Sequence, residues 1–279
     1  MSLQTYFRDK HVIVTGGSSG IGLCLAHQLV ALGAEVSLVA RREGPLKAAQ
    51  EAVLAGKSGA KVHVLALDVS DFEDVQAKMG AHVEAHPAQM LINNAGIALP
   101  GRFLEQDYSE FRSQMDINFF GCVHMCKVLA PHFISQGGGH ICNVGSLAGV
   151  LSIYGYSSYA ATKFAMYGFS DALRAELKPH GVAVTHLLPP DTDTPQHEAE
   201  MALLPEETKA IAGNVKMLTP DQVAQAGLQG MAAGRFEVIP GFEARSTIAA
   251  ARLLPGVTRW VCDNAVKKIS GAKARAGGS

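Results

Sequence analysis

Three side chains near the middle of the chain could together move a proton to or from a carbonyl oxygen. Tyr159 and Lys163 stand four residues apart in YAATK, in a segment with a helical pattern, so both project from one face. An ammonium beside a phenol favours phenolate and lowers a pKa that starts at about 10. Ser146, thirteen residues before the tyrosine, could hydrogen-bond a substrate carbonyl. Taken alone, such a pair is more often a packed aromatic beside a surface lysine, as we interpret Tyr154 and Tyr156.

A glycine-rich turn near the start of the chain could hold a pyrophosphate. The segment TGGSSGIG, residues 15–22, lies between an apolar run and a helical pattern. Glycines let the backbone turn tightly there, and the N-terminus of the following helix offers free N–H groups and a positive dipole end. An ordinary glycine-rich turn is the alternative. The candidate cofactor-binding residues of this turn are Gly16, Ser18, Ser19, Gly20, Ile21 and Gly22.

The residues after the second strand indicate which dinucleotide would bind. Sites for NAD usually place an acid there, whereas this chain has Arg41 and Arg42 after LVA. An arginine can form a bidentate pair with a 2′-phosphate, and Ser18 could add a hydrogen bond, so the pattern favours NADPH. Alternatively, the two arginines are solvated, with Glu43 close enough to pair with one of them.

Two further strand ends could contact the cofactor. Asp68 and Val69 close the third strand, where the carboxylate could accept a hydrogen bond from an adenine amino group or cap the next helix. Asn94, Ala95 and Gly96 close the fourth, where small residues let the backbone pass close to a ribose.

The order of segments predicts how these residues are positioned. Six strand-like apolar runs, at 11–17, 34–41, 61–70, 89–96, 140–146 and 182–190, alternate with helical patterns. Such alternation is typical of βαβ units, so we expect an α/β fold with a doubly wound parallel sheet of the Rossmann type. The prediction is one catalytic domain over residues 1–240, a helical extension over 241–270 and a disordered tail over 271–279.

Composition excludes several classes of function. The net charge of −1 gives no general attraction to nucleic acid, although residues 241–279 carry seven basic and two acidic side chains, a local charge of +5. The five cysteines form no CxxC and no cluster with histidines at metal-ligand spacing, so we expect buried thiols in a reducing compartment and no metal. The absence of a signal core or long apolar run predicts a cytoplasmic protein.

Together these motifs resemble the classical short-chain dehydrogenase/reductases. TGGSSGIG, NNAG, the asparagine of NFFG, the serine and YAATK occur in the order and spacing of that family over about residues 8–240. The resemblance implies a catalytic tetrad of Asn118, Ser146, Tyr159 and Lys163. Tyr159 would protonate the carbonyl oxygen and Ser146 would polarise it. Lys163 would lower the tyrosine pKa and hold the nicotinamide ribose, while Asn118 would hold a water that relays protons.

The heptapeptide PPDTDTP, residues 189–195, narrows the resemblance. It ends the strand after the catalytic helix. At this place the family has Pro-Gly and then a threonine that contacts the nicotinamide carboxamide. The resemblance therefore implies that Pro189, Thr192 and Thr194 contact the cofactor. Pro190 replaces the glycine, so the backbone is stiffer and lacks one N–H donor. The segment resembles the 3-ketodihydrosphingosine reductases, which reduce a long-chain amino ketone with NADPH. Eukaryotic members continue into hydrophobic anchoring segments, whereas this sequence ends in a polar tail.

The sequence is compatible with more than one role for the C-terminal segment and with more than one substrate. Residues 246–269 mix apolar side chains with arginines and lysines around Trp260, as in a helix that lies on a membrane surface, but Pro255 interrupts the pattern and a helix covering a pocket or subunit interface fits equally. Other substrates compatible with the family are a steroid, a retinoid or a 3-oxoacyl thioester. A non-catalytic NADP-sensing regulator would need a damaged tetrad. The family resemblance suggests a homodimer or homotetramer.

Overall fold

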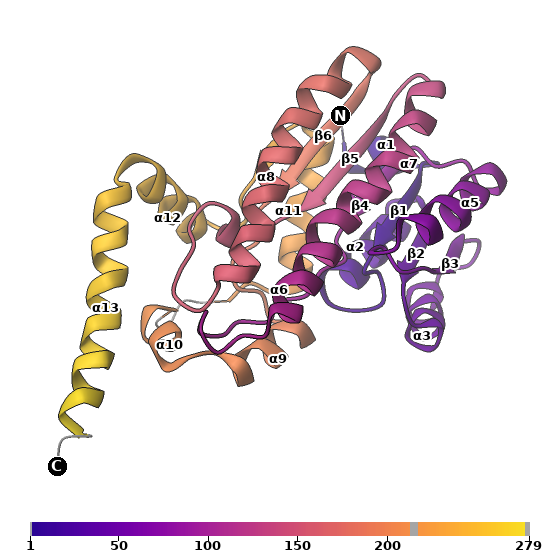
Figure 1. The fold of residues 1–279 in the computed structure, drawn as a ribbon. Coiled ribbons are helices and arrows are strands. Elements are labelled where there is room, and N and C mark those ends of the chain that lie inside the picture. Colours follow the sequence, from indigo (N-terminus) through magenta and orange to yellow (C-terminus); the bar gives the residue numbers. More distant parts are fainter. Residues whose placement is uncertain (1, 213–216, 277–279) are drawn as a thin grey trace.

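The computed structural model describes residues 2–212 and 217–276, and its centre is a seven-stranded sheet (Figure 1). The strand order is β3-β2-β1-β4-β5-β6-β7, and every neighbouring pair is parallel. The strands are β1 His11–Thr15, β2 Glu35–Ala40, β3 Val62–Ala66, β4 Met90–Asn93, β5 Gly139–Val144, β6 Val182–Leu187 and β7 Glu237–Val238. The predicted doubly wound sheet is confirmed. The seventh strand has only two residues, too few to give a sequence signal.

The strands are apolar on both faces because helices cover both. Along β1, Val12 and Val14 pack in one core cluster and Ile13 packs in the other, as the period of two dictates. The first cluster receives α2 Gly20–Ala31, α3 Glu43–Leu54 and α11 Pro220–Ala232. The second receives η1 Val75–Met79, α5 Gly80–Ala85, α7 Gly121–Ser135 and α8 Ser157–Leu177.

Short and irregular helices complete the body of the molecule. They are α1 Leu3–Phe7, α4 Phe72–Asp74, α6 Tyr108–Gln114, η2 Met115–Phe120, η3 Leu147–Gly149, η4 Lys178–His180, α9 Pro195–Leu203 and α10 Glu206–Ala212. Segments η1 and η2 are π-helical turns, a geometry that often occurs at functional sites.

The continuous helix Tyr108–Ser135 is, within the described residues, the one stretch long and apolar enough to cross a membrane. Its apolar side chains are used inside the protein. Met125, Leu129 and Phe133 are fully buried in the second core cluster against the sheet. The apolar character of this segment is therefore explained by its position as a core helix.

Two helices follow the sheet, α12 Phe242–Leu253 and α13 Pro255–Ala276 (Figure 1). Pro255 interrupts the helical pattern of residues 246–269, as the sequence indicated, and it starts α13, a position that proline favours. Helix α13 includes residues 271–276, and the disordered tail predicted over 271–279 stays a prediction. Alanine, lysine and arginine are good helix formers and extend α13 there. Residues 277–279 lie outside the described part.

The cysteines differ in part from the prediction. Cys122, Cys126 and Cys142 are buried thiols as expected, but Cys24 and Cys262 are only half-buried. Cys24 lies on α2 and Cys262 on α13.

The topology determines where a ligand can bind. From β1 the chain moves outward to β2 and β3, and then returns to place β4 on the other side of β1. Loops from the carboxyl ends of β1 and β4 therefore diverge and leave a crevice at this switch point. The segments after β5 and β6 extend the crevice along the same edge.

Candidate active site

A cavity of about 710 Å³ lies at the carboxyl ends of the strands and collects almost all the predicted site residues. Of the predicted set, Gly22 and Asn118 alone do not line it. The lining includes Gly16, Ser18, Ser19, Gly20, Ile21, Arg41, Arg42, Asp68, Val69, Asn94, Ala95, Gly96, Ser146, Tyr159, Lys163, Pro189, Thr192 and Thr194.

The glycine turn has the geometry of a phosphate-binding turn. Gly16 and Gly20 have φ angles of 64° and 53°, which residues with side chains rarely adopt. A Cβ on Gly22 would lie 2.3 Å from the carbonyl oxygen of Gly16, so the turn closes only with glycine there. Helix α2 begins at Gly20, with its N-terminus at the cavity. These residues fit the pyrophosphate of a dinucleotide.

The NNAG segment supports this turn directly. The backbone N–H groups of Asn94 and Ala95 donate to Thr15 Oγ1 at 2.9 and 3.0 Å. The Asn94 side chain donates through Nδ2 to the carbonyl oxygens of Thr15 and Gly16, at 3.1 and 3.3 Å. Asn94 therefore fixes the glycine turn, a function that the sequence did not indicate.

The adenine end of the cavity is lined by the predicted charged residues. Arg41 and Arg42 are exposed and line the cavity, while Glu43 forms its ion pair with Lys47 at 2.7 Å. The alternative pairing of Glu43 with an arginine is therefore not the arrangement found. The Asp68 carboxylate accepts hydrogen bonds from Ser70, and Asp71 caps the next helix in its place.

Tyr159 and Lys163 lie on one face of α8, and the surroundings together raise the pKa of Tyr159 rather than lower it. Lys163 Nζ is 5.5 Å from the Tyr159 ring centroid and donates to the Val144 carbonyl at 3.1 Å. Burial lowers the pKa of Lys163 to about 8. Burial, and then the nearby Glu200 carboxylate, raise the pKa of Tyr159 well above its usual value, while a hydrogen bond with Ser146 lowers it. The phenol is therefore held protonated, the form that donates a proton.

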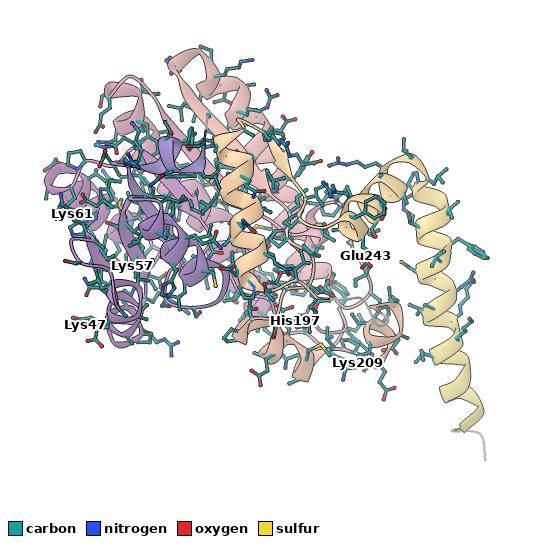
Figure 2. The ribbon with its side chains drawn as sticks, turned by 180° about the vertical axis from the view of Figure 1, so that it is seen from behind. Lys47, Lys57, Lys61, His197, Lys209 and Glu243 are labelled. Atoms are coloured by element: carbon teal, nitrogen blue, oxygen red, sulfur yellow. The ribbon has the colours of Figure 1, made fainter. Side chains whose placement is uncertain are left out.

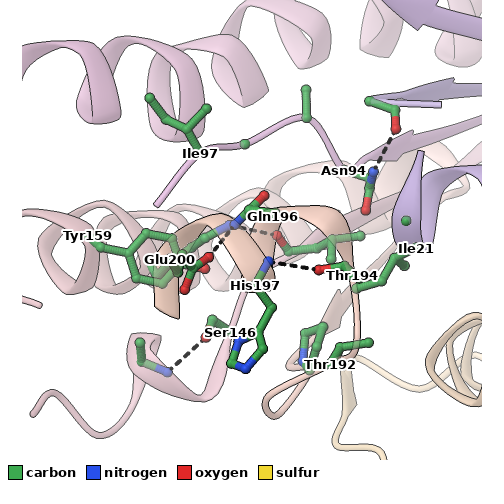
Figure 3. A pocket seen from close by; sticks show the side chains of 18 of the residues that line it. Ile21, Asn94, Ile97, Ser146, Tyr159, Thr192, Thr194, Gln196, His197 and Glu200 are labelled. Atoms are coloured by element: carbon green, nitrogen blue, oxygen red, sulfur yellow. Dashed lines mark hydrogen bonds between the residues drawn. The ribbon is translucent and has the colours of Figure 1, made fainter. Parts of the chain in front are cut away.

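Ser146 and Asn118 occupy different positions relative to the cavity. Ser146 caps η3 by accepting from the Ala148 N–H at 3.1 Å, and its hydroxyl lines the cavity near Tyr159 (Figure 3). Asn118 is fully buried, and its amide both accepts from the Ile97 N–H and donates to the Ile97 carbonyl, each at 2.8 Å. The Asn118 side chain therefore holds the loop after β4 in place. The water-holding function implied for Asn118 stays a prediction.

PPDTDTP ends a strand, passes along the cavity and starts a helix. After β6, the Pro189 carbonyl accepts from the Leu147 N–H at 3.1 Å, which joins the motif to the segment that follows Ser146. Thr194 caps α9 by accepting from the His197 N–H at 3.2 Å, and Pro195 occupies the first turn. The Thr194 methyl would lie 3.3 Å from a Cβ on Gly20, so the motif also approaches the glycine turn.

Sequence reasoning missed the residues that α9 contributes. The Glu200 carboxylate accepts from Tyr156 Oη at 3.2 Å. It also accepts from Gln196 Nε2 at 2.8 Å (Figure 3). Tyr156 lines the cavity, and its ring lies 5.8 Å from that of Tyr159, so it is more than a packed aromatic. No motif distinguishes Glu200 from Glu198, and only the direction of the helix face places it in the cavity.

Apolar side chains also line the cavity. They come from the loops after β4 and β5, from η2, from α9 and from the segments that follow α9 and precede α11. They are Ile97, Ile117, Leu147, Leu151, Ile153, Met201, Leu204 and Met217. An extended apolar substrate group would find its contacts here.

Comparison with known proteins places the chain in a family. Residues 10–203 match the family model for short chain dehydrogenases. The chain is a short-chain dehydrogenase/reductase. The resemblance of its motifs to this family is therefore confirmed. The matched region ends with α9, so that α10 to α13 lie outside it.

Individual members of the family resemble this short-chain dehydrogenase/reductase along most of its length. The chain is 33% identical over 274 residues to a 3-ketodihydrosphingosine reductase of Dictyostelium discoideum, covering 91% of this chain and 81% of that protein. A Burkholderia phymatum family member in complex with NAD has a TM-score of 0.79 at 28% identity, covering 88% of this chain and 94% of the other. A Sphingobium yanoikuyae member in complex with NADPH has a TM-score of 0.76 at 28% identity, covering 91% of this chain and 95% of the other.

Proposed function

We propose that this enzyme uses NADPH to reduce the 3-keto group of a long-chain 2-amino ketone of the 3-ketodihydrosphingosine type to a secondary alcohol. One observation carries the proposal: a single cavity joins the glycine turn and two arginines to Tyr159, Ser146 and apolar side chains. The relatives that bear the name of this activity, such as the Dictyostelium discoideum enzyme, support the substrate class.

The residues around Tyr159 determine how the reduction would proceed. NADPH supplies a hydride to the carbonyl carbon. Tyr159 Oη donates a proton to the carbonyl oxygen, so that the C=O bond becomes an alcohol, and Ser146 orients that oxygen by a hydrogen bond. Lys163, which is buried beside the phenol, is positioned to hold the ribose and to bring positive charge to the site.

The choice of NADPH over NADH rests on Arg41 and Arg42. Solved relatives contain either cofactor, so the family alone does not decide. No acidic side chain occupies the position directly after β2, and both arginines line the cavity without an ion pair to Glu43. A 2′-phosphate would give these guanidinium groups a partner of matching charge and geometry.

The test is a comparison of substrates in one assay. Oxidation of NADPH at 340 nm would be followed with 3-ketodihydrosphingosine in detergent micelles, a ketosteroid, a retinoid and a 3-oxoacyl thioester. We expect the amino ketone to have the highest kcat/KM. Faster turnover of another ketone would show that the substrate class is different, while the proposed ketone reductase activity would still hold. NADPH binding without turnover of any ketone would favour the cofactor-sensing regulator.

We also propose that α12 and α13 bring the enzyme to an anionic membrane surface. Thr247 of α12 lines the cavity, so this extension lies at the cavity wall. Trp260 is 65% exposed, and Val257 and Val261 on the same helix are also exposed. The surplus of basic residues after 241 complements anionic lipid, and the bilayer would supply the lipid-like substrate.

Co-sedimentation with phosphatidylserine-containing vesicles tests this attachment. We expect the wild type to sediment and the variant Trp260→Ser with Val257→Ser to remain in solution, with unchanged NADPH binding. Equal sedimentation of both proteins would exclude the proposed surface. If the variant instead changes the mass measured by light scattering, the apolar side chains lie between protein copies.

For location and assembly, we propose a cytoplasmic homodimer or homotetramer with peripheral membrane contact. The family membership supports the assembly, and the reduced cysteines in the described residues are compatible with the compartment. Light scattering on the purified chain gives the oligomeric state, and a monomeric mass at micromolar concentration would contradict it.

A further inference from the structure

Glu200 is placed where a cationic group of the substrate would lie. Its carboxylate lines the same cavity as Ser146 and Tyr159, and Figure 3 shows it beside the Tyr159 side chain. Its charge is close enough to raise the pKa of the Tyr159 phenol. Glu200 is therefore near the atom that would protonate the carbonyl oxygen.

The hydrogen bonds of Glu200 leave room for another partner. One carboxylate oxygen accepts from Tyr156 Oη and the other from Gln196 Nε2. Both donors are neutral, and a carboxylate can accept about four hydrogen bonds. Among the described residues, no lysine or arginine forms an ion pair with Glu200.

The Glu200 carboxylate opposes the reaction, and the nearby His197 and Lys163 do not cancel this effect, because the pKa values of Glu200 and Tyr159 stay raised. Loss of the proton from Tyr159 creates a phenolate, which Glu200 disfavours by charge repulsion. Burial likewise raises the pKa of Glu200, because its charge has left water. An ammonium group would relieve both penalties by pairing with the carboxylate.

We propose that Glu200, held by Tyr156 and Gln196, binds the ammonium group of an amino ketone and selects such substrates over plain ketones. The proposal rests on the proposed function, since it requires that the carbonyl oxygen sits at Tyr159 and Ser146. In a 2-amino-3-ketone the ammonium is attached to the carbon next to the carbonyl, so it lies within a few ångströms of the reacting group. Steroids, retinoids and acyl thioesters offer no cation at that place.

The experiment compares two ketones and three proteins. The ketones are 3-ketodihydrosphingosine and its 2-deamino analogue, and the proteins are wild type, Glu200→Gln and Glu198→Gln. Glu198 is an exposed acid on the same helix and serves as the matched control. For Glu200→Gln we expect kcat/KM with the amino ketone to fall at least tenfold, and kcat/KM with the deamino ketone to stay equal or rise. Glu198→Gln should behave as wild type with both ketones.

The outcomes separate this inference from the proposed function. An equal loss with both ketones, at unchanged NADPH affinity, would make Glu200 a positioning residue without cation selectivity and overturn the inference. Unchanged kinetics of Glu200→Gln would also overturn it while leaving the amino-ketone reductase standing. If wild type reduces neither ketone but another member of the panel, the proposed function fails first.

A second, independent feature lies at the opposite end of the sheet. Glu35 begins β2, His63 is the second residue of β3 and His86 follows α5, so all three belong to the amino-terminal edge. Ligand atoms of Glu35, His63 and His86 all lie within 4.8 Å of one another, and His63 Nε2 is 2.7 Å from Glu35 Oε1. Figure 2 shows Lys61, the residue before β3, far from His197 of the cavity.

More imidazoles surround this cluster. The ring of His82 lies 5.2 Å from that of His86 and 6.0 Å from that of His63. His11 and His82 both contact the Ser37 hydroxyl at 2.7 Å, which fixes the orientation of both rings.

We infer that Glu35, His63 and His86 form a binding site for a divalent transition metal such as Zn²⁺. Two imidazoles and one carboxylate are a ligand set that Zn²⁺ uses, with the remaining position open to water. A plain ion pair between His63 and Glu35 explains their contact but not the close approach of His86, whose tilted ring has its centroid 4.1 Å from that of His63. Lys61 also approaches Glu35 at 3.6 Å, but it is 72% exposed and free to turn into water.

Titration with Zn²⁺ against a chromophoric chelator tests this site. We expect one equivalent to bind and to raise the melting temperature, and His63→Gln or His86→Gln to weaken binding at least tenfold. His27→Gln, a histidine on α2 outside the cluster, is the control and should change nothing. Absence of saturable binding, or binding that is equal in all these proteins, would overturn the inference.

Discussion

The two walls of the cavity differ in what holds them. The cofactor wall is built from backbone at the ends of β1, β2 and β4, where hydrogen bonds and glycine conformations determine each position. The substrate wall consists mainly of side chains from α9 and from the loops after β4 and β5. The first wall follows rules shared by parallel sheets, whereas the second depends on which way individual side chains point.

Tyr159 lies where the two walls meet, and its loss should have the largest effect. Tyr159→Phe removes the proton donor but keeps the ring, so we expect kcat to fall by about 10²–10⁴-fold. The dissociation constant of NADPH, measured by fluorescence titration, should change less than twofold. A kcat within tenfold of wild type would mean that another group, such as Tyr156, donates the proton.

Gly22→Ala tests the rigidity of the cofactor wall. The new methyl group would lie 2.3 Å from the Gly16 carbonyl oxygen and 2.6 Å from Asn94 Nδ2, so the turn must open. We expect a loss of NADPH affinity and a decrease of about 1–3 kcal/mol in the free energy of unfolding. Gly44→Ala, where a Cβ meets nothing within 4 Å, is the control and should not destabilise the protein. If both variants bind NADPH normally, the turn is not a rigid cradle.

Arg41→Ser tests the part of the cofactor wall that selects NADPH. A charge-assisted contact to a phosphate contributes about 1.5–3 kcal/mol, so the preference for NADPH over NADH should fall by about 10- to 100-fold. The ratio of kcat/KM for the two cofactors is the measurement. An unchanged ratio in Arg41→Ser, and also in Arg42→Ser, would remove the arginines from cofactor selection.

Lys163→Met tests how the burial of this lysine in the cofactor wall affects stability at different pH values. The pKa of Lys163 falls from 10.5 to about 8 on folding, so between these values the folded protein binds fewer protons than the unfolded chain. The stability of the wild type therefore gains from rising pH in this window, and methionine has no such gain. In urea unfolding without cofactor, the stability of the variant relative to wild type should decrease from pH 7 to pH 10. A constant difference would place the lysine in a less buried state.

Met201→Ser addresses the substrate wall and should have the smallest effect. Met201 lines the cavity and is 43% exposed, so its loss removes only part of a contact surface. We expect KM for the long-chain ketone to rise by about threefold, in keeping with a partial side-chain burial. The affinity for NADPH should not change, and a parallel loss of both would show that the two walls are coupled.

The contrast between the walls also explains what the sequence could predict. The glycine turn, the arginines and YAATK were found because the fold requires those residue types at those spacings. Glu200 could not be found, since it depends on how α9 leaves PPDTDTP and on the direction of one helix face. The pKa of Tyr159 is raised by burial and then by Glu200, and the spacing of YAATK reveals neither of these influences.

The metal cluster was hidden for a similar reason. Glu35, His63 and His86 lie on three separate elements, so no spacing in the sequence reveals them. The parallel register brings the starts of β2 and β3 together, as in the pairing of Val36 with Val62. Clusters of this kind depend on tertiary structure and need coordinates to be seen.

The most direct test of the account follows the hydride itself. The purified enzyme would be incubated with 3-ketodihydrosphingosine and NADPH that carries deuterium at both C4 positions, and the product analysed by mass spectrometry. We expect the wild type to form dihydrosphingosine with one deuterium on the carbinol carbon, and Tyr159→Phe to form none. An unreduced ketone with wild type, while NADPH binding remains intact, would contradict it.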